Sequence, residues 1–242
     1  FLGVSLFFTL SGFLITNLLL REGEVVGQVR LGRFWARRAR RLLPAALAGI
    51  ALAIVVTVAV GTADQLRALP GDVIGAAGYG ANWRFILAHD GYRAGFAAPS
   101  ALLHYWSLAI EEQLYIVLPL LVVAVAGGRW SIQRIVARRA WPDRRVVGGS
   151  ETHRRALAWI LAGLIALSAA ATLRVGSHGT DRIYFGTDTR MVELLAGALL
   201  ATVLGFPGLG LPEAGARQPV RRWAHAVGVV AAVATAATTP TA

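Results

Sequence analysis

Long uncharged apolar runs constrain this chain more than any other feature of its sequence. Phe1–Leu20, Leu42–Val60 and Ala156–Leu173 hold 20, 19 and 18 residues without a charged side chain. A helix of about 20 apolar residues crosses a hydrocarbon core of roughly 30 Å. Shorter or interrupted runs occupy residues 113–126, 191–206 and 223–238. We therefore predict an all-α fold, a polytopic transmembrane helix bundle with about six spans in a single integral-membrane domain covering residues 1–242.

The composition agrees with a membrane protein and excludes several kinds of site. The chain is 56% hydrophobic and 15% charged, whereas soluble domains average about 45–50% apolar and about 25% charged residues. It has no cysteine, which excludes disulfides, a cysteine nucleophile and thiolate metal sites in these residues. The histidines lack the spacing of metal ligands, so no metal site is predicted. The net charge of +11 comes from arginines between the apolar runs, which indicates membrane topology and not nucleic-acid binding.

The distribution of arginine predicts an orientation in the membrane. Residues 21–41, 127–155 and 205–222 together contain 18 arginines, and the segments between them contain six. Cytoplasmic loops of membrane proteins carry the excess of positive charge. We therefore expect residues 21–41 and 127–155 on the cytoplasmic side of a bacterial inner membrane. Residues 71–88 are too polar and glycine-rich for an ordinary span, so we expect them to be re-entrant or interfacial, with a full crossing as the alternative.

The stretch "HYWSLAIEEQLY" places polar side chains at the start of an apolar segment. On a helix that begins near residue 104, four of them share a stripe of about 80°: His104, Ser107, Glu111 and Tyr115. Glu112 lies at the edge of the stripe. A charge at the centre of a bilayer helix costs about 2.5–3.5 kcal/mol, so such residues are candidates for function. We predict general acid–base chemistry here; the alternative is a helix end at the membrane interface, with Trp106 in an aromatic belt.

Two further motifs combine charge with an apolar run. "FWARRARRLLPA" supplies four guanidinium groups, which bind phosphate through paired hydrogen bonds: Arg37, Arg38, Arg40 and Arg41. They are either a site for an anionic ligand or an anchor for the topology.

In "TRMVELLAGALLA", Arg190 and Glu193 are one helical turn apart. They either neutralise each other or help to bind a polar acceptor beside Glu111.

These motifs, together with "FLGVSLFFTLSGFLIT", resemble the bacterial membrane acyltransferase family three, which includes O-antigen and peptidoglycan O-acetyltransferases. The resemblance spans nearly the whole chain. It implies a bundle of about ten helices that moves an acyl group, usually acetyl, from cytoplasmic acyl-CoA to a hydroxyl of an extracytoplasmic glycan. The expected partners are therefore acyl-CoA, a carbohydrate acceptor and the lipid bilayer. A polytopic transporter component and an inactive fragment of such an enzyme are the alternatives.

The resemblance also suggests roles for individual residues. The arginine block matches the family's arginine motif, expected near the phosphates of the donor. Ser107, Glu111 and Tyr115 match its "WSL" block and, with His104, are the predicted catalytic residues. The predicted substrate-binding residues are Trp106, Glu112, Arg190 and Glu193. The family's first helix, with a histidine thought to act as a base, would precede Phe1, so we expect a chain truncated at both ends. Some members continue into an esterase-like domain.

Overall fold

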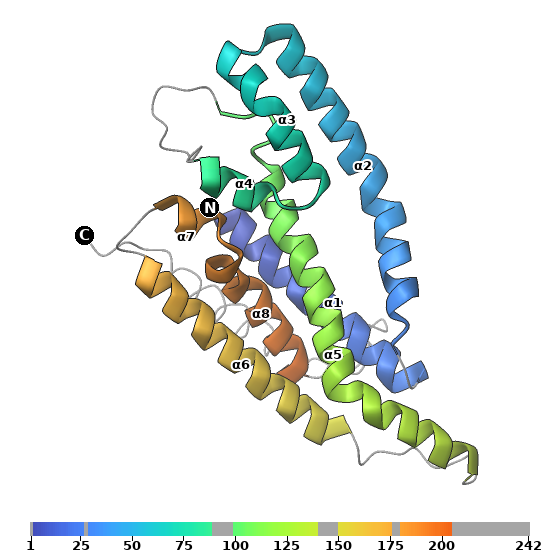
Figure 1. Cartoon of the computed structure of the whole chain (residues 1–242). Coiled ribbons are helices and arrows are strands. Elements are labelled where there is room, and N and C mark those ends of the chain that lie inside the picture. The colour runs from blue at the N-terminus through green and yellow to red at the C-terminus, as the bar shows by residue number, and fades with distance from the viewer. Residues whose placement is uncertain (1, 27–28, 89–98, 140–149, 176–179, 205–242) are drawn as a thin grey trace, which may run out of the picture. The chain divides into compact units, whose positions relative to one another are not determined.

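The computed structural model describes residues 2–26, 29–88, 99–139, 150–175 and 180–204. Within these ranges it contains eight helices and no strand: α1 (Leu2–Val26), α2 (Leu31–Val60), α3 (Ala63–Ala77), α4 (Ala81–Ala88), α5 (Tyr105–Arg139), α6 (Ser150–Val175), α7 (Thr180–Phe185) and α8 (Thr187–Leu204) (Figure 1). The predicted all-α fold is confirmed. The apolar run at residues 223–238 lies outside the described residues.

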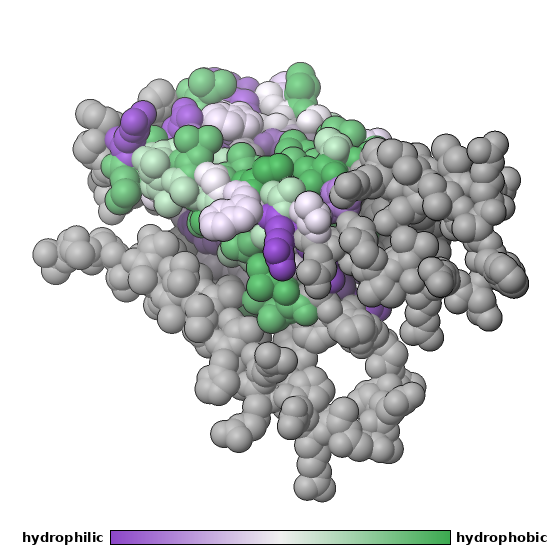
Figure 2. All heavy atoms as spheres, turned by 90° about the horizontal axis from the view of Figure 1, so that it is seen from below, coloured by the Kyte–Doolittle hydropathy of each residue, from purple (hydrophilic) through white to green (hydrophobic). Residues whose placement is uncertain are grey.

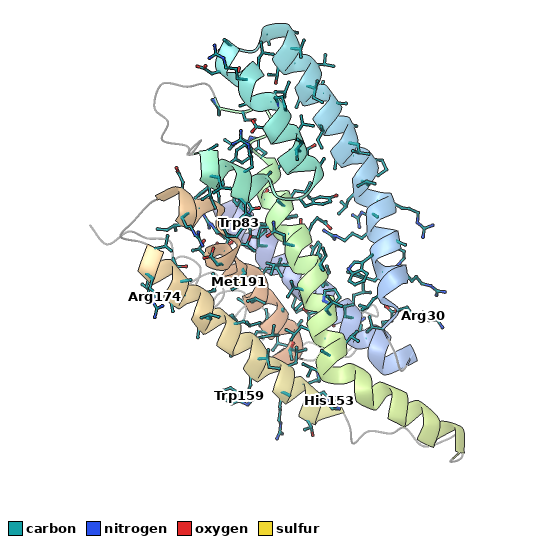
Figure 3. The ribbon with its side chains drawn as sticks, in the orientation of Figure 1. Arg30, Trp83, His153, Trp159, Arg174 and Met191 are labelled. Atoms are coloured by element: carbon teal, nitrogen blue, oxygen red, sulfur yellow. The ribbon has the colours of Figure 1, made fainter. Side chains whose placement is uncertain are left out.

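Four of the described helices are long and apolar enough to cross a membrane. The candidate spans are Gly3–Gly23, Leu31–Val60, Tyr105–Val125 and Thr152–Val175. Many of their large apolar side chains are exposed; on α6, Trp159 is 79% exposed and projects away from its helix (Figure 3). Figure 2 shows hydrophobic side chains exposed among the described residues on one face. Exposed side chains of this kind suit contact with lipid, as expected for a multi-pass membrane protein.

The chain divides into two compact units. One comprises the described parts of Phe1–Val29, Leu121–Ile165 and Val192–Ala242. In it, glycines bring the backbones of α1 and α8 together, because a Cβ at Gly12 would collide with the carbonyl of Leu194, and one at Gly197 with that of Thr9. Small residues allow such close helix packing in membrane proteins. The Ser5 hydroxyl also donates a hydrogen bond of 2.7 Å to Glu193 across this contact.

The other unit comprises the described parts of Arg30–Leu120 and Ala166–Met191. Its helices α2 and α5 lie antiparallel, since Trp35 Nε1 donates to the Tyr115 carbonyl (3.1 Å) and the Tyr105 hydroxyl to that of Ala46 (2.7 Å). Gly49 leaves room for the Tyr105 hydroxyl. Helix α2 begins at Leu31, well before the apolar run at residue 42, so the arginine block is helical.

Residues 71–88 form parts of two short helices and not one continuous span. Helix α3 has 15 residues and α4 has eight, both too short to cross a bilayer alone. A capping box at Thr62 and Gln65 starts α3, because the reciprocal bonds satisfy free backbone N–H groups. The helix packs on α2 through a small apolar cluster of Ile50, Ala53, Ala76 and Leu102. Its buried Asp72 lies 3.5 Å from the Arg84 guanidinium of α4.

Candidate functional site

Arg38 on α2 is the centre of a charged cluster with α5. Its Nε and Nη2 atoms lie 2.7 and 2.6 Å from Glu112 Oε1. Nη2 is also 3.8 Å from Glu111 Oε1. The guanidinium carbon stands 3.3 Å from the centre of the Tyr115 ring, where the electron-rich face of the ring attracts a cation. One cation is therefore shared by two carboxylates and an aromatic ring.

Glu111 is the most enclosed carboxylate of this cluster. It is 5% exposed, and the Tyr115 hydroxyl, one helical turn further along α5, donates a hydrogen bond to it. The side chains of Arg38 and Glu112 are 21% and 15% exposed. Removing charges from water is costly unless they are paired and hydrogen-bonded. The formal charge of the three ionised groups is −1, so the cluster offers a carboxylate that can accept a proton.

From the sequence, the arginine block and the carboxylates of α5 were expected to serve two separate sites, one for the donor and one for the reaction. The side of the membrane on which residues 21–41 lie stays a prediction. The structure brings Arg38 into contact with Glu112. The physical reason is the stagger of the two helices. Helix α5 begins at Tyr105, opposite Ala46, so its carboxylates reach the first turns of α2. Hydropathy marks where a helix is apolar, not which residues of another helix it contacts.

The predicted stripe on α5 is divided in the structure. Glu111 and Tyr115 are hydrogen-bonded to each other. His104 precedes the helix and is exposed, and the Ser107 hydroxyl donates to the His104 backbone carbonyl at 3.2 Å. Trp106 is only 2% exposed, and its ring lies 4.7 Å from that of Tyr184. The catalytic roles of His104 and Ser107 stay predictions, but these two residues do not extend the Glu111–Tyr115 pair.

The other arginines of the block differ from Arg38 in their surroundings. Arg37, Arg40 and Arg41 are exposed on α2. Arg40 Nε donates to the backbone carbonyl of Ala36 in its own helix (3.2 Å). The block therefore combines one guanidinium held by α5 with three exposed ones that can meet an anionic ligand.

The second predicted pair, Arg190 and Glu193, lies on α8. Arg190 Nε donates to the Tyr184 carbonyl (3.2 Å), and its guanidinium lies 5.0 Å from the centre of the Tyr184 ring. Glu193 is buried and accepts the hydrogen bond from Ser5. Each residue thus has contacts within its own unit, and their expected roles toward an acceptor stay predictions.

Sequence reasoning missed a ring of polar side chains beside the charged cluster. Gln113 follows Glu112 directly on α5 and exchanges hydrogen bonds with Asn82 of α4 and Thr187 of α8. Gln113 also donates to the backbone carbonyl of Tyr79, between α3 and α4. The glycines on either side of Tyr79 signalled a break in the chain. Nothing in the spacing of these residues indicated that they meet.

Comparisons with known proteins agree with the resemblance of the motifs. A family model described as "Acyltransferase domain" matches residues 1–238. The chain belongs to this acyltransferase family. It is 37% identical to "Peptidoglycan O-acetyltransferase OatA" of Listeria monocytogenes over 85% of its own length and 30% of that protein. It is 39% identical to "Putative peptidoglycan O-acetyltransferase YrhL" of Bacillus subtilis over 84% of this chain and 29% of the relative.

The chain therefore spans about three tenths of the length of these relatives. No solved structure matches it. Membership of the family identifies these residues as an acyltransferase domain.

Proposed function

We propose that this domain transfers an acetyl group from acyl-CoA on the cytoplasmic side to a hydroxyl of an extracytoplasmic glycan. The family and the two relatives named for O-acetylation of peptidoglycan support the reaction class. The two sets of charged groups in the second unit suit the two substrates. Exposed arginines fit an anionic donor, and an enclosed carboxylate fits an acceptor that must lose a proton.

The observation that carries the proposal is the cluster of Arg38, Glu111 and Tyr115. In the proposed reaction Glu111 accepts the proton of the acceptor hydroxyl as its oxygen attacks the thioester carbonyl. The new C–O bond forms, the C–S bond breaks, and the CoA thiolate leaves and takes up a proton. The Tyr115 hydroxyl donates a hydrogen bond to Glu111, and the Arg38 guanidinium lies 3.8 Å from it, so both contacts orient the carboxylate. A general base placed in this way typically contributes about 10²–10⁴-fold to the rate.

The proposal divides the arginine block between two tasks. Arg37, Arg40 and Arg41 are exposed and are proposed to bind the phosphates of acyl-CoA, because charge-assisted hydrogen bonds to phosphate are strong. Arg38 is engaged with Glu112 and the Tyr115 ring and is proposed to serve the reacting groups instead.

The test uses the full-length gene product purified into lipid nanodiscs. It is incubated with acetyl-CoA labelled in the acetyl group and, in parallel, with soluble peptidoglycan fragments and other surface glycans. Alkali-labile label on a glycan, detected by mass spectrometry together with free CoA, is the expected result. A protein that moves a solute across vesicles and yields no acetylated product would support the transporter alternative and contradict the proposal.

A further inference from the structure

Tyr79 has an unusual backbone conformation at the break between α3 and α4. Its φ angle is +53°, the left-handed region, and in the described residues it is the one non-glycine residue with a positive φ. That region costs an L-residue roughly 1–2 kcal/mol. Gly78 and Gly80 stand on either side, yet the tyrosine occupies the strained position. Strain of this kind persists only where surrounding structure enforces it, and it gathers at functional sites.

Two sets of hydrogen bonds hold this conformation: the backbone bonds that end α3, among them Gly80 N–H to the Gly75 carbonyl (2.8 Å), and the polar ring. Gln113 Nε2 donates to the Tyr79 carbonyl (2.8 Å) and to Asn82 Oδ1 (3.1 Å). Thr187 donates to Gln113 Oε1 (2.6 Å), and Asn82 Nδ2 donates to Thr187 Oγ1 (2.9 Å) and to the carbonyl of Phe185 (3.0 Å). Both amide groups thus use both of their N–H donors, and Asn82 is fully buried. A fully satisfied polar network is rigid, so it fixes Tyr79 relative to α5.

Tyr79 is held next to the charged cluster, because its carbonyl accepts a hydrogen bond from Gln113, the neighbour of Glu112 on α5. Burial raises the pKa of the Tyr79 phenol above its ordinary value, the negative charge of Glu112 raises it further, and Arg38 lowers it. The hydroxyl therefore keeps its proton at neutral pH and can donate a hydrogen bond. Among the residues that the structure describes, none accepts a hydrogen bond from it.

The proposed reaction needs such a donor. Negative charge develops on the carbonyl oxygen of the acyl group as the acceptor attacks, and two nearby carboxylates oppose that charge. The Tyr115 hydroxyl is already bonded to Glu111, and the Arg38 guanidinium is engaged with Glu112. The Tyr79 hydroxyl is a neutral hydrogen-bond donor that is bonded to neither of these carboxylates.

We propose that Tyr79 is a catalytic residue of this acyltransferase: its phenol donates a hydrogen bond to the carbonyl oxygen of the acyl group. The ring of Asn82, Gln113 and Thr187 serves as the positioning device that holds it. This inference rests on the proposed function. Removal of one hydrogen-bond donor to a developing oxyanion typically lowers kcat by about 10²–10³-fold.

The decisive experiment compares two tyrosine variants of the full-length protein in nanodiscs, with acetyl-CoA as donor and the glycan that wild type acetylates as acceptor. Tyr79→Phe removes the hydroxyl and keeps the ring, and we expect kcat to fall about 100-fold with both KM values nearly unchanged. Tyr105→Phe is the matched control, because its hydroxyl bonds only a backbone carbonyl of α2; its kcat should stay within about twofold while its thermal stability decreases slightly.

A second variant separates chemistry from folding. Tyr79→Gly relieves the left-handed strain, so its thermal stability should equal or exceed that of Tyr79→Phe while its kcat is equally low. Unchanged kcat in Tyr79→Phe, with active wild type, would overturn this inference and leave the proposed function intact. A wild-type protein that forms no acetylated product would overturn both. If kcat in either Tyr79 variant falls only as far as the fraction of folded protein falls, the role of Tyr79 is also overturned.

Discussion

The contact between α1 and α8 and the contact between α2 and α5 use different chemistry. Backbone approach at Gly12 and Gly197 dominates the first, supplemented by one hydrogen bond from Ser5 to Glu193. The second combines an ion pair, a cation–ring contact and hydrogen bonds to the backbone. Close packing of small residues stabilises helix pairs in lipid without burying a charge. Charged side chains in the membrane cost free energy and are usually retained for function. Changes at the first contact should therefore alter stability, and changes at the second should alter catalysis.

The largest expected effect comes from the carboxylate at the second contact. Glu111→Gln keeps the shape of the side chain and its ability to bond Tyr115, but it cannot accept a proton. We expect acyl transfer to fall about 10²–10⁴-fold, with insertion and thermal stability close to wild type. Steady-state kinetics in nanodiscs measure the change. Asp64→Asn is the control, since Asp64 pairs only with the exposed Arg67; equal losses in both variants would remove Glu111 from the reaction.

The next largest effect concerns the first contact. Gly197→Val places a side chain against the Thr9 carbonyl, and overpacking of this kind typically costs about 1–3 kcal/mol. The variant should unfold at a lower temperature, while the molecules that remain folded keep the wild-type kcat. Thermal unfolding followed by tryptophan fluorescence and active-site titration measure both quantities. Gly163→Val is the control, because no atom lies within 4 Å of a Cβ there. Equal stability of the two variants would contradict close packing at Gly197.

A smaller effect is expected for the exposed part of the arginine block. Arg37→Ala combined with Arg40→Ala removes two charge-assisted contacts that we assign to the donor phosphates, each worth about 1.5–3 kcal/mol. The KM for acyl-CoA should rise at least tenfold, and kcat at saturating donor should change little. Isothermal titration with CoA checks the loss of affinity. Unchanged affinity would mean that these two arginines only anchor the topology.

The smallest expected effect is a pH dependence of stability. Because the pKa of the Tyr79 phenol is raised, its contribution to stability is complete below the ordinary tyrosine pKa of about 10 and is lost as pH rises through the folded-state pKa. Thermal unfolding temperatures between pH 8 and pH 11 should fall more steeply for wild type than for Tyr79→Phe. Parallel curves for the two proteins would contradict the raised pKa of the Tyr79 phenol.

Much of the fold follows from the sequence because long uncharged runs admit few structures. The described residues of the first run, from Leu2, and the runs beginning at Leu42 and Ala156 all lie within helices of the expected kind. The i,i+4 spacing likewise predicted that Glu111 and Tyr115 share a helix face, and they are hydrogen-bonded. Both predictions depend on local periodicity, which a single sequence displays directly.

The remaining parts of the site depend on contacts between distant segments. The pairing of Arg38 with Glu112 joins residues 74 positions apart, and the bond between Asn82 and Thr187 joins residues 105 positions apart. The stagger of α2 against α5 decides the first pairing, and the break in the chain at Tyr79 decides the second. Neither the stagger nor the break produces a periodic pattern in the sequence. For the same reason, the exposure of His104 could not be read from a helical wheel that began at that residue.

The kinetics of Arg38→Gln test the central claim most directly. The Arg38 guanidinium contacts Glu111, Glu112 and the Tyr115 ring. We therefore expect kcat to fall at least tenfold while the KM for acyl-CoA stays within about twofold, because the substituted group acts on the base and not on the donor. A raised KM for acyl-CoA with an unchanged kcat would show that Arg38 belongs to the donor phosphates and would contradict the account.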